Sequence, residues 1–197
     1  MRFDKRRGFT VIELMLVVGI VGVIAAIAIP NFVQYQARSR RSEAYTNLSA
    51  MGRAQKAYQA DHNSYVDTGV SFPDPSLYNS HHLSPQTMPW DAASQAAFAD
   101  LGWGPEGKVA YSYASYTNVT ATTGPNCGTC DLCFTGAAYG DVDGNGSVQT
   151  VLYVHPEQVG GALAWCNEEL FKNPPAIDPS SGQQIFDGVA VRSNTDF

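Results

Sequence analysis

The stretch that decides the fold lies near the N-terminus, where residues 9–29 read FTVIELMLVVGIVGVIAAIAI. These 21 residues include one charged side chain, Glu13. A helix of this length is about 31 Å long, which is roughly the thickness of the hydrocarbon core of a bilayer. Four basic residues precede it: Arg2, Lys5, Arg6 and Arg7. The pattern predicts a membrane-spanning helix with its N-terminal end in the cytoplasm, because basic residues stay on that side.

Glu13 is the unusual residue in this stretch, because a carboxylate costs about 2.5–3.5 kcal/mol at the middle of a membrane and less near an end. An ionisable residue at such a depth usually has a partner and a function. No basic residue occurs in the following turns of the helix. A cut between Gly8 and Phe9 would create a positively charged α-amine four residues before Glu13. In a bundle of helices, the amine of one chain could then meet the carboxylate of another.

The run from Lys5 to Leu14, KRRGFTVIEL, resembles the processing motif of type IV prepilins, which the pseudopilins of type II secretion share. The resemblance is strong over residues 1–60 and loose beyond them. It implies that a prepilin peptidase in the membrane cuts after Gly8, that Phe9 becomes N-methylated, and that Glu13 neutralises the N-terminus of a neighbouring subunit. It also implies a homopolymer built by an assembly machinery, located in the inner membrane before assembly and in an extracellular bacterial fibre afterwards.

The function that the resemblance implies is structural: a type IV pilus subunit for adhesion, twitching motility or DNA uptake, and no enzyme. A minor pilin or a type II secretion pseudopilin is the alternative, because both share the motif. The four histidines show no metalloenzyme spacing, and the sequence has no nucleophile elbow and no phosphate-binding glycine loop.

The expected organisation has four parts: a leader at 1–8, a membrane and filament-core helix at 9–30, its amphipathic second half at 31–61, and a globular head at 62–197. Pro30 predicts a kink or a local break in the helix. Gly19 and Gly22 either permit close approach of another helix or are simply tolerated in the membrane.

The second half of the helix shows apolar positions spaced three and four residues apart, which predicts one face packed on the head. That face consists of Ala44, Leu48, Met51, Ala54, Gln55 and Tyr58. Basic residues also occur in and beside this half: Arg38, Arg40, Arg41, Arg53 and Lys56. They either contact lipid headgroups and then acidic heads of neighbours, or form a solvated face.

The sequence of the head predicts a loop over 66–90 and a short helix at 92–101 capped by Asp91. It also predicts strands at 109–116, 132–139, 148–155 and near 188–192. This pattern gives an α+β fold, in which a long N-terminal helix packs on a small antiparallel sheet. The resemblance implies the pilin fold with a disulfide-bounded C-terminal region. From Asp61 onward there are fifteen acidic and three basic side chains, which argues against direct nucleic-acid binding by the head.

Four cysteines, at 127, 130, 133 and 166, allow two interpretations. Their spacing suits zinc or an iron–sulfur cluster, which would make the chain a membrane-anchored redox or metal-binding protein. An even number of cysteines outside the cytoplasm favours two disulfides instead. Three connectivities are possible, and a bond from Cys130 or Cys133 to Cys166 would close the long C-terminal loop that the resemblance implies.

Asp141, Asp143 and Asn145 copy the first half of a calcium-binding loop, with glycine at its sixth position. Leu152 stands at the twelfth position, where a calcium loop needs a carboxylate. The segment therefore favours a β-turn, and calcium is the one cofactor left open.

Overall fold

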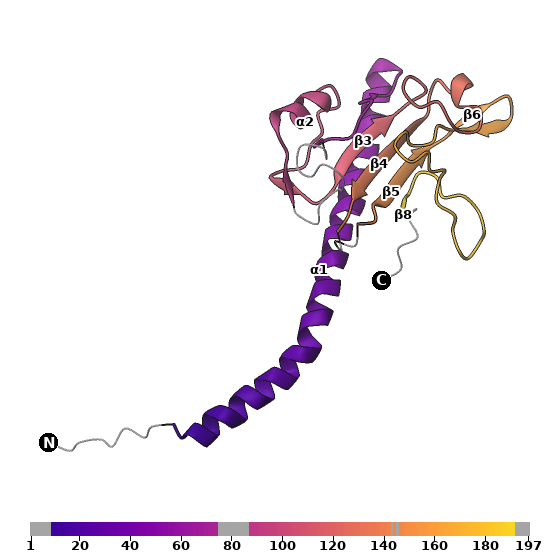
Figure 1. Cartoon of the computed structure of the whole chain (residues 1–197). Helices are drawn as coiled ribbons and strands as arrows, with labels where there is room; N and C mark the ends of the chain where they lie inside the picture. The colour runs from indigo at the N-terminus through magenta and orange to yellow at the C-terminus, as the bar shows by residue number, and fades with distance from the viewer. Residues whose placement is uncertain (1–8, 75–86, 143, 145, 192–197) are drawn as a thin grey trace. The chain divides into compact units, whose positions relative to one another are not determined.

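The computed structural model describes residues 9–74, 87–142, 144 and 146–191, and it is drawn in Figure 1. The chain divides into two compact units, with the boundary between Arg38 and Ser39. The elements are α1 Val11–His62, β1 Met88–Pro89, α2 Ala92–Ala97, β2 Lys108–Val109, β3 Ser112–Tyr116, a 3₁₀ helix Cys127–Thr129, β4 Phe134–Gly140, β5 Gln149–His155, β6 Glu157–Val159, β7 Ala162–Ala164 and β8 Val189–Val191.

Helix α1 remains helical through Pro30, so of the predicted kink or local break the break is wrong, and the kink stays a prediction. Proline removes one backbone hydrogen-bond donor, while the helical turns on either side keep their backbone hydrogen bonds. The side-chain amide of Asn31 also donates to the carbonyl oxygen of Ile27 at 3.1 Å. The helix ends at His62, and Asn63 follows with a φ of 52°, the left-handed conformation that commonly ends a helix.

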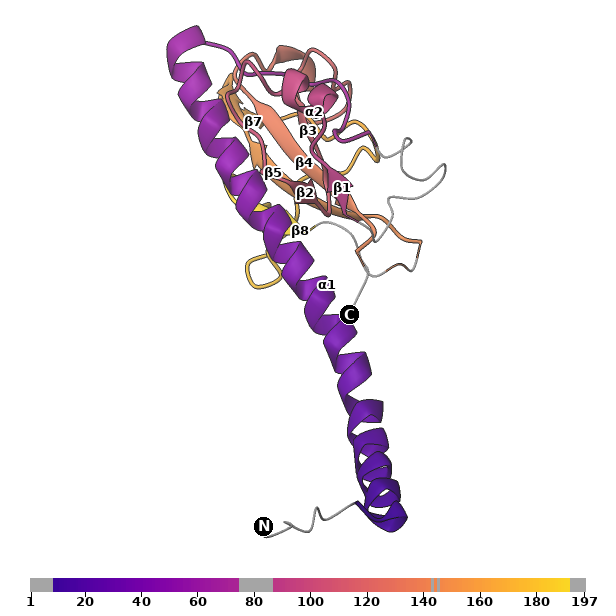
Figure 2. The same ribbon diagram turned by 90° about the vertical axis from the view of Figure 1, so that its left-hand side faces the viewer.

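The centre of the head is an antiparallel sheet with the strand order β3-β4-β5-β8. Gly136 of β4 pairs with Ser115 of β3 and with Tyr153 of β5, which fixes the register of the three strands. Residues 39–62 of α1 lie along one face of this sheet (Figure 2). The predicted α+β class is therefore confirmed, and the predicted strands 132–139, 148–155 and 188–192 correspond to β4, β5 and β8.

The helix packs on the sheet through the predicted apolar face, since Ala44, Leu48, Met51 and Gln55 are fully buried. Two glycines allow the close approach. A Cβ at Gly136 would lie 2.6 Å from Met51 Cε, and a Cβ at Gly52 would lie 2.8–3.0 Å from three ring atoms of Tyr153.

Other details of the head differ from the expectation. The predicted strand 109–116 is two strands in different sheets, because β2 pairs with β1 whereas β3 pairs with β4. Asp91 does cap α2, by accepting from the amide of Ser94 at 2.8 Å, but α2 ends at Ala97 rather than at residue 101. The hairpin of β6 and β7 was not predicted; Gly160 and Gly161 turn it with φ values of 61° and 87°.

Candidate functional site

The N-terminal site begins with a reciprocal cap at the start of α1. The Glu13 carboxylate accepts hydrogen bonds from the amide and the hydroxyl of Thr10, both at 2.8 Å. The Thr10 hydroxyl accepts from the Glu13 amide at 3.3 Å. This is a capping box, in which a threonine and a glutamate three residues later satisfy each other's backbone donors. The acidic group thus lies at the helix N-terminus, where the helix dipole favours negative charge.

The surface that follows the cap is apolar and exposed. Between Phe9 and Tyr35, the large apolar side chains are 48–86% exposed within the described structure. Beside Gly19 and Gly22 there is open space of at least 4 Å. Among the described residues, α1 is the one helix long and apolar enough to cross a membrane. Such a surface is stable only in lipid or against other apolar surfaces.

Polar groups join the second half of α1 to the head. The amide nitrogen of Gln55, itself fully buried, donates to the carbonyl of Val66 and to the hydroxyl of Ser115, both at 2.7 Å. The Glu43 carboxylate accepts from the amide of Ala110 at 3.0 Å. Burial raises the pKa of Glu43 above its ordinary value, although this hydrogen bond opposes the change. These bonds fix one register of the helix along the sheet.

Asp187 connects three parts of the head. Its carboxylate accepts from Lys56 of α1 at 2.7 Å and lies 2.6 Å from the Nδ1 atom of His155 in β5. Partial burial opposes ionisation of Asp187, but the hydrogen bonds from Lys56 and His155 outweigh it and lower the pKa of this carboxyl. Lys56, one of the basic residues expected to face solvent, lipid or a neighbour, is therefore paired within its own chain.

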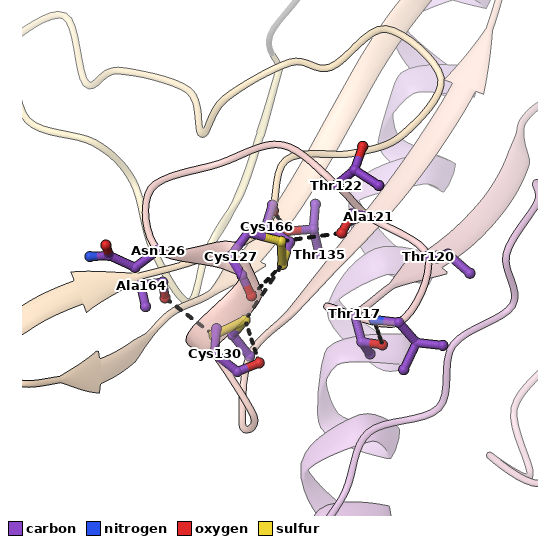
Figure 3. The surroundings of a disulfide bond; sticks show 12 residues. Thr117, Thr120, Ala121, Thr122, Asn126, Cys127, Cys130, Thr135, Ala164 and Cys166 are labelled. Carbon is purple, nitrogen blue, oxygen red and sulfur yellow. Dashed lines mark hydrogen bonds between the residues drawn. A yellow bond between two sulfur atoms is a disulfide. The ribbon is translucent and has the colours of Figure 1, made fainter.

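All four cysteines are joined in two disulfides, Cys127–Cys166 and Cys130–Cys133. Figure 3 shows Cys127, Cys130 and Cys166 in this cluster. The expected partner of Cys166, Cys130 or Cys133, is therefore wrong. The amide of Trp165 donates to the carbonyl of Pro125, and the amide of Asn167 donates to that of Thr123. This pairing of 123–125 with 165–167 brings Cys127 next to Cys166, with 4.7 Å between their Cα atoms.

The cysteine cluster is buried, and Cys133 Sγ lies 4.0 Å from Cys166 Sγ. In the described part of the chain, no group of three or more histidine, cysteine or acidic side chains is arranged to hold a metal ion. The sulfur atoms that would bind a metal are used in the two disulfides.

Glu168 is a fully buried carboxylate that the sequence did not indicate. It accepts from the hydroxyl of Tyr139 at 2.6 Å and from the amides of Phe171 and Asn173 at 3.0 and 2.8 Å. Burial raises the pKa of Tyr139 well above its ordinary value, so its hydroxyl remains a donor. The carboxylate thereby holds the loop after Cys166 against the sheet.

The turn after β4 depends on Asp141, whose carboxylate oxygens accept from the amides of Gly144 and Gly146 at 2.8 and 3.0 Å. These bonds are those of a turn closed by an aspartate side chain. Asp143 and Asn145, the other two expected calcium ligands, lie outside the described residues. Gly8, the expected cleavage residue, and the leader 1–8 lie outside them as well.

The structure thus places Phe9 and Glu13 at the same end of α1 and brings the four cysteines into one cluster. Thr10, Glu43, Glu168 and Asp187 were missed. A sequence signal existed for Thr10, because threonine, two residues and glutamate before an apolar run is the capping-box pattern. The other three depend on tertiary neighbours and have no local signal.

The apolar N-terminal helix with its acidic cap is the part of the chain that resembles type IV pilins. Residues 3–29 match the family described as "Prokaryotic N-terminal methylation motif". The chain is 58% identical over 67 residues to the type IV major pilin protein PilA of Myxococcus xanthus, covering 34% of this chain and 30% of that protein.

Two further relatives match a similar length of the chain. The type IV major pilin protein PilE1 of Neisseria gonorrhoeae is 38% identical over 66 residues, 34% of this chain and 40% of that protein. The type II secretion system core protein G of Escherichia coli is 34% identical over 65 residues, 33% of this chain and 45% of that protein. The chain matches less than half of the length of each of these relatives.

Proposed function

We propose that this chain is a structural subunit of a type IV pilus, which polymerises through α1 into a fibre for adhesion, twitching motility or DNA uptake. In this proposal, a prepilin peptidase cuts after Gly8, Phe9 is N-methylated, and the Glu13 carboxylate meets the new N-terminus of a neighbouring subunit. The chain resides in the inner membrane first and in an extracellular fibre afterwards. It performs no catalysis of its own.

The observation that carries the proposal is a carboxylate at the start of a long, exposed apolar helix. Burial of one large apolar side chain contributes about 1.5–3 kcal/mol, so a bundle of such helices gains much from association. The same bundle would bury the carboxylate of Glu13, and a buried charge needs a partner of opposite sign. The α-amine of a chain that begins at Phe9 is the group at the right depth.

The test separates the charge of Glu13 from its role in the cap. Glu13→Gln removes the charge but keeps a side chain that can complete a capping box. Thr10→Ala removes the cap but keeps the charge. In the native cell, the mature chain should begin at N-methylated Phe9 by mass spectrometry. Filaments should disappear in Glu13→Gln and persist in Thr10→Ala, with cleavage intact in both.

Filaments that persist in Glu13→Gln would overturn the pairing with the neighbouring N-terminus. A chain that still begins at Met1 would overturn the cleavage, and a membrane-anchored domain would remain.

A pseudopilin of a type II secretion system is the second candidate, because core protein G of Escherichia coli matches the same region. Fibres recovered outside wild-type cells and made of this chain would favour the pilus. Loss of exoprotein secretion without loss of surface fibres, in a deletion strain, would favour the pseudopilin.

Calcium at the Asp141 turn stays a prediction. Titration of calcium into the full chain tests it. A saturable heat signal that Asp141→Asn abolishes would support the site, whereas the turn alone predicts no signal.

A further inference from the structure

The described residues of the head form a groove lined by aromatic rings at α2 and at the loop 102–107 that follows it. Its volume is about 430 Å³, within the range of about 300–1,000 Å³ that is usual for small-molecule sites. Trp90, Phe98 and Trp103 line it together with the polar side chains of Gln95 and Glu106. Figure 1 shows α2 beside the β3 edge of the sheet, away from β8.

Neighbouring rings hold the aromatic wall of the groove in place. The Trp103 ring lies 4.9 Å from the Phe98 ring and 5.6–5.8 Å from those of Tyr113 and Trp90, each time at a steep angle. Phe98 is fully buried, whereas Trp103 is partly exposed. An indole held on several sides presents an apolar surface that loses little conformational freedom when a ligand binds.

Gly104 brings the backbone of the loop against the indole nitrogen of Trp90. A Cβ at residue 104 would lie 2.8 Å from Trp90 Nε1. Any larger residue there would therefore press on this nitrogen. The backbone N–H of Trp90 donates to the carbonyl of Gly107 at 3.0 Å, whereas its indole N–H has no hydrogen-bond acceptor within the described structure and can donate to a ligand.

The lining combines apolar ring surface with separate donors and acceptors, and this combination matches a sugar. The C–H bonds on one face of a pyranose ring are attracted to the electron-rich face of an aromatic ring. Its hydroxyls need donors and acceptors beside that face, which the Trp90 N–H, the exposed Gln95 amide and the Glu106 carboxylate supply. A purely apolar ligand would leave these polar groups without partners.

The charge of the groove restricts the class of sugar. Among the described residues that line it, Glu106 is the one ionisable side chain. The head from Asp61 onward carries fifteen acidic and three basic side chains. Sugars that carry carboxylates or sulfates would therefore be repelled.

We propose that this groove, the tryptophan groove, binds an uncharged oligosaccharide. A sugar ring lies on the exposed part of Trp103, while Gln95, Glu106 and the Trp90 N–H bind its hydroxyls. The proposal does not depend on polymerisation, because all of these groups belong to one chain.

The test uses the full chain in dodecylphosphocholine, since detergents with sugar headgroups would compete. Cellotetraose and chitotetraose serve as uncharged probes, and tetragalacturonate serves as the anionic probe. Binding is followed by saturation-transfer NMR and by titration of tryptophan fluorescence. At least one uncharged probe should bind saturably and more tightly than tetragalacturonate.

The variants locate the site. Trp103→Ala should weaken binding at least about tenfold, because it removes the stacking surface. Gln95→Ala should weaken it about two- to tenfold, the effect of one hydrogen bond. Leu163→Ala is the matched control: Leu163 is an apolar side chain of β7 that is 41% exposed, and its loss should change nothing.

Gln95 is exposed, so its variant keeps the test valid even if Trp103→Ala fails to fold. Absence of saturable binding of both uncharged probes to the wild type would overturn the proposal. Unchanged affinity in Gln95→Ala and in a folded Trp103→Ala would overturn it too. So would a preference for tetragalacturonate, or displacement of the sugar by N-acetyltryptophan amide, which would indicate a protein-docking site. Either result of the Glu13 experiment, loss or persistence of filaments, would leave all of these outcomes unaffected.

Discussion

Loss of the Cys127–Cys166 disulfide should destabilise the head far more than loss of Cys130–Cys133. The paired variants are Cys127→Ala with Cys166→Ala and Cys130→Ala with Cys133→Ala, so neither leaves an odd thiol. All four cysteines are at most 4% exposed, so the lost packing is similar in both variants and largely cancels in the comparison. What differs is the length of chain that each bond closes.

The sequence separations are 39 and 3 residues. The chain-entropy estimate gives about 3.9 kcal/mol of stabilisation for the longer loop and about 1.6 kcal/mol for the shorter one. The expected difference is therefore about 2.3 kcal/mol. With a denaturant slope of about 1–3 kcal/mol per molar urea, the unfolding midpoints of the two variants should differ by about 1–2 M.

The assay is urea unfolding of the full chain in detergent, followed by tryptophan fluorescence without reductant. Peptide mapping of the wild type under non-reducing conditions is the control for the pairing. Equal midpoints, or a lower midpoint in the Cys130/Cys133 variant, would refute the reasoning. A mapped peptide that joins Cys133 to Cys166 would refute the pairing itself.

Three smaller perturbations test the polar and packing contacts of the head. Tyr139→Phe should destabilise the head by about 1.5–3 kcal/mol in urea unfolding, because Glu168 loses its hydroxyl donor; an unchanged midpoint would show that this bond adds nothing. Asp187→Asn keeps a residue that tolerates the φ of 55° found there. Because the pKa of Asp187 is lowered, its ionised carboxylate stabilises the fold above pH 3.8, and this stabilisation is lost as the pH falls through the pKa of the folded state. The difference in unfolding free energy between wild type and variant should therefore be present at neutral pH and disappear below pH 3.8. A difference that is the same at every pH would contradict the role of its lysine and histidine partners. Gly52→Val should lower the thermal midpoint by about 2–12 °C, from about 1–3 kcal/mol of overpacking against the Tyr153 ring; a rise would mean that the ring can move aside.

The sequence was sufficient to predict the helices and strands whose residues show a clear local pattern. The apolar run from Phe9 and the stripe that includes Leu48 and Met51 predicted α1 to within one residue of its end at His62. The predicted strands 132–139 and 148–155 correspond to β4 and β5 at the centre of the sheet. These patterns can be recognised from the local sequence, because the spacing of apolar residues within one element shows which of its faces is buried.

The remaining features depend on contacts between distant segments. The partner of Cys166 was predicted wrongly because the backbone pairing of Thr123 with Asn167 determines which cysteine lies next to it. The local sequence around these two residues does not indicate that pairing. Glu168 and Asp187 were missed for the same reason. A carboxylate in a loop is expected at the surface unless its hydrogen-bond donors are known, and those donors come from distant segments. The tryptophan groove was also missed, because its rings lie at three separate places in the chain: Trp90 follows β1, Phe98 caps the end of α2, and Trp103 lies in the loop beyond it.

The Cys127–Cys166 bond gives the head a covalent ring. Strands β4, β5, β6 and β7 lie inside this ring, whereas the two edge strands of the main sheet, β3 and β8, lie outside it. A protease that cut once at the exposed turn of Gly160 and Gly161 would open the ring without separating the chain into two pieces. A chain nicked at that turn would still be joined through the disulfide to its own helix α1.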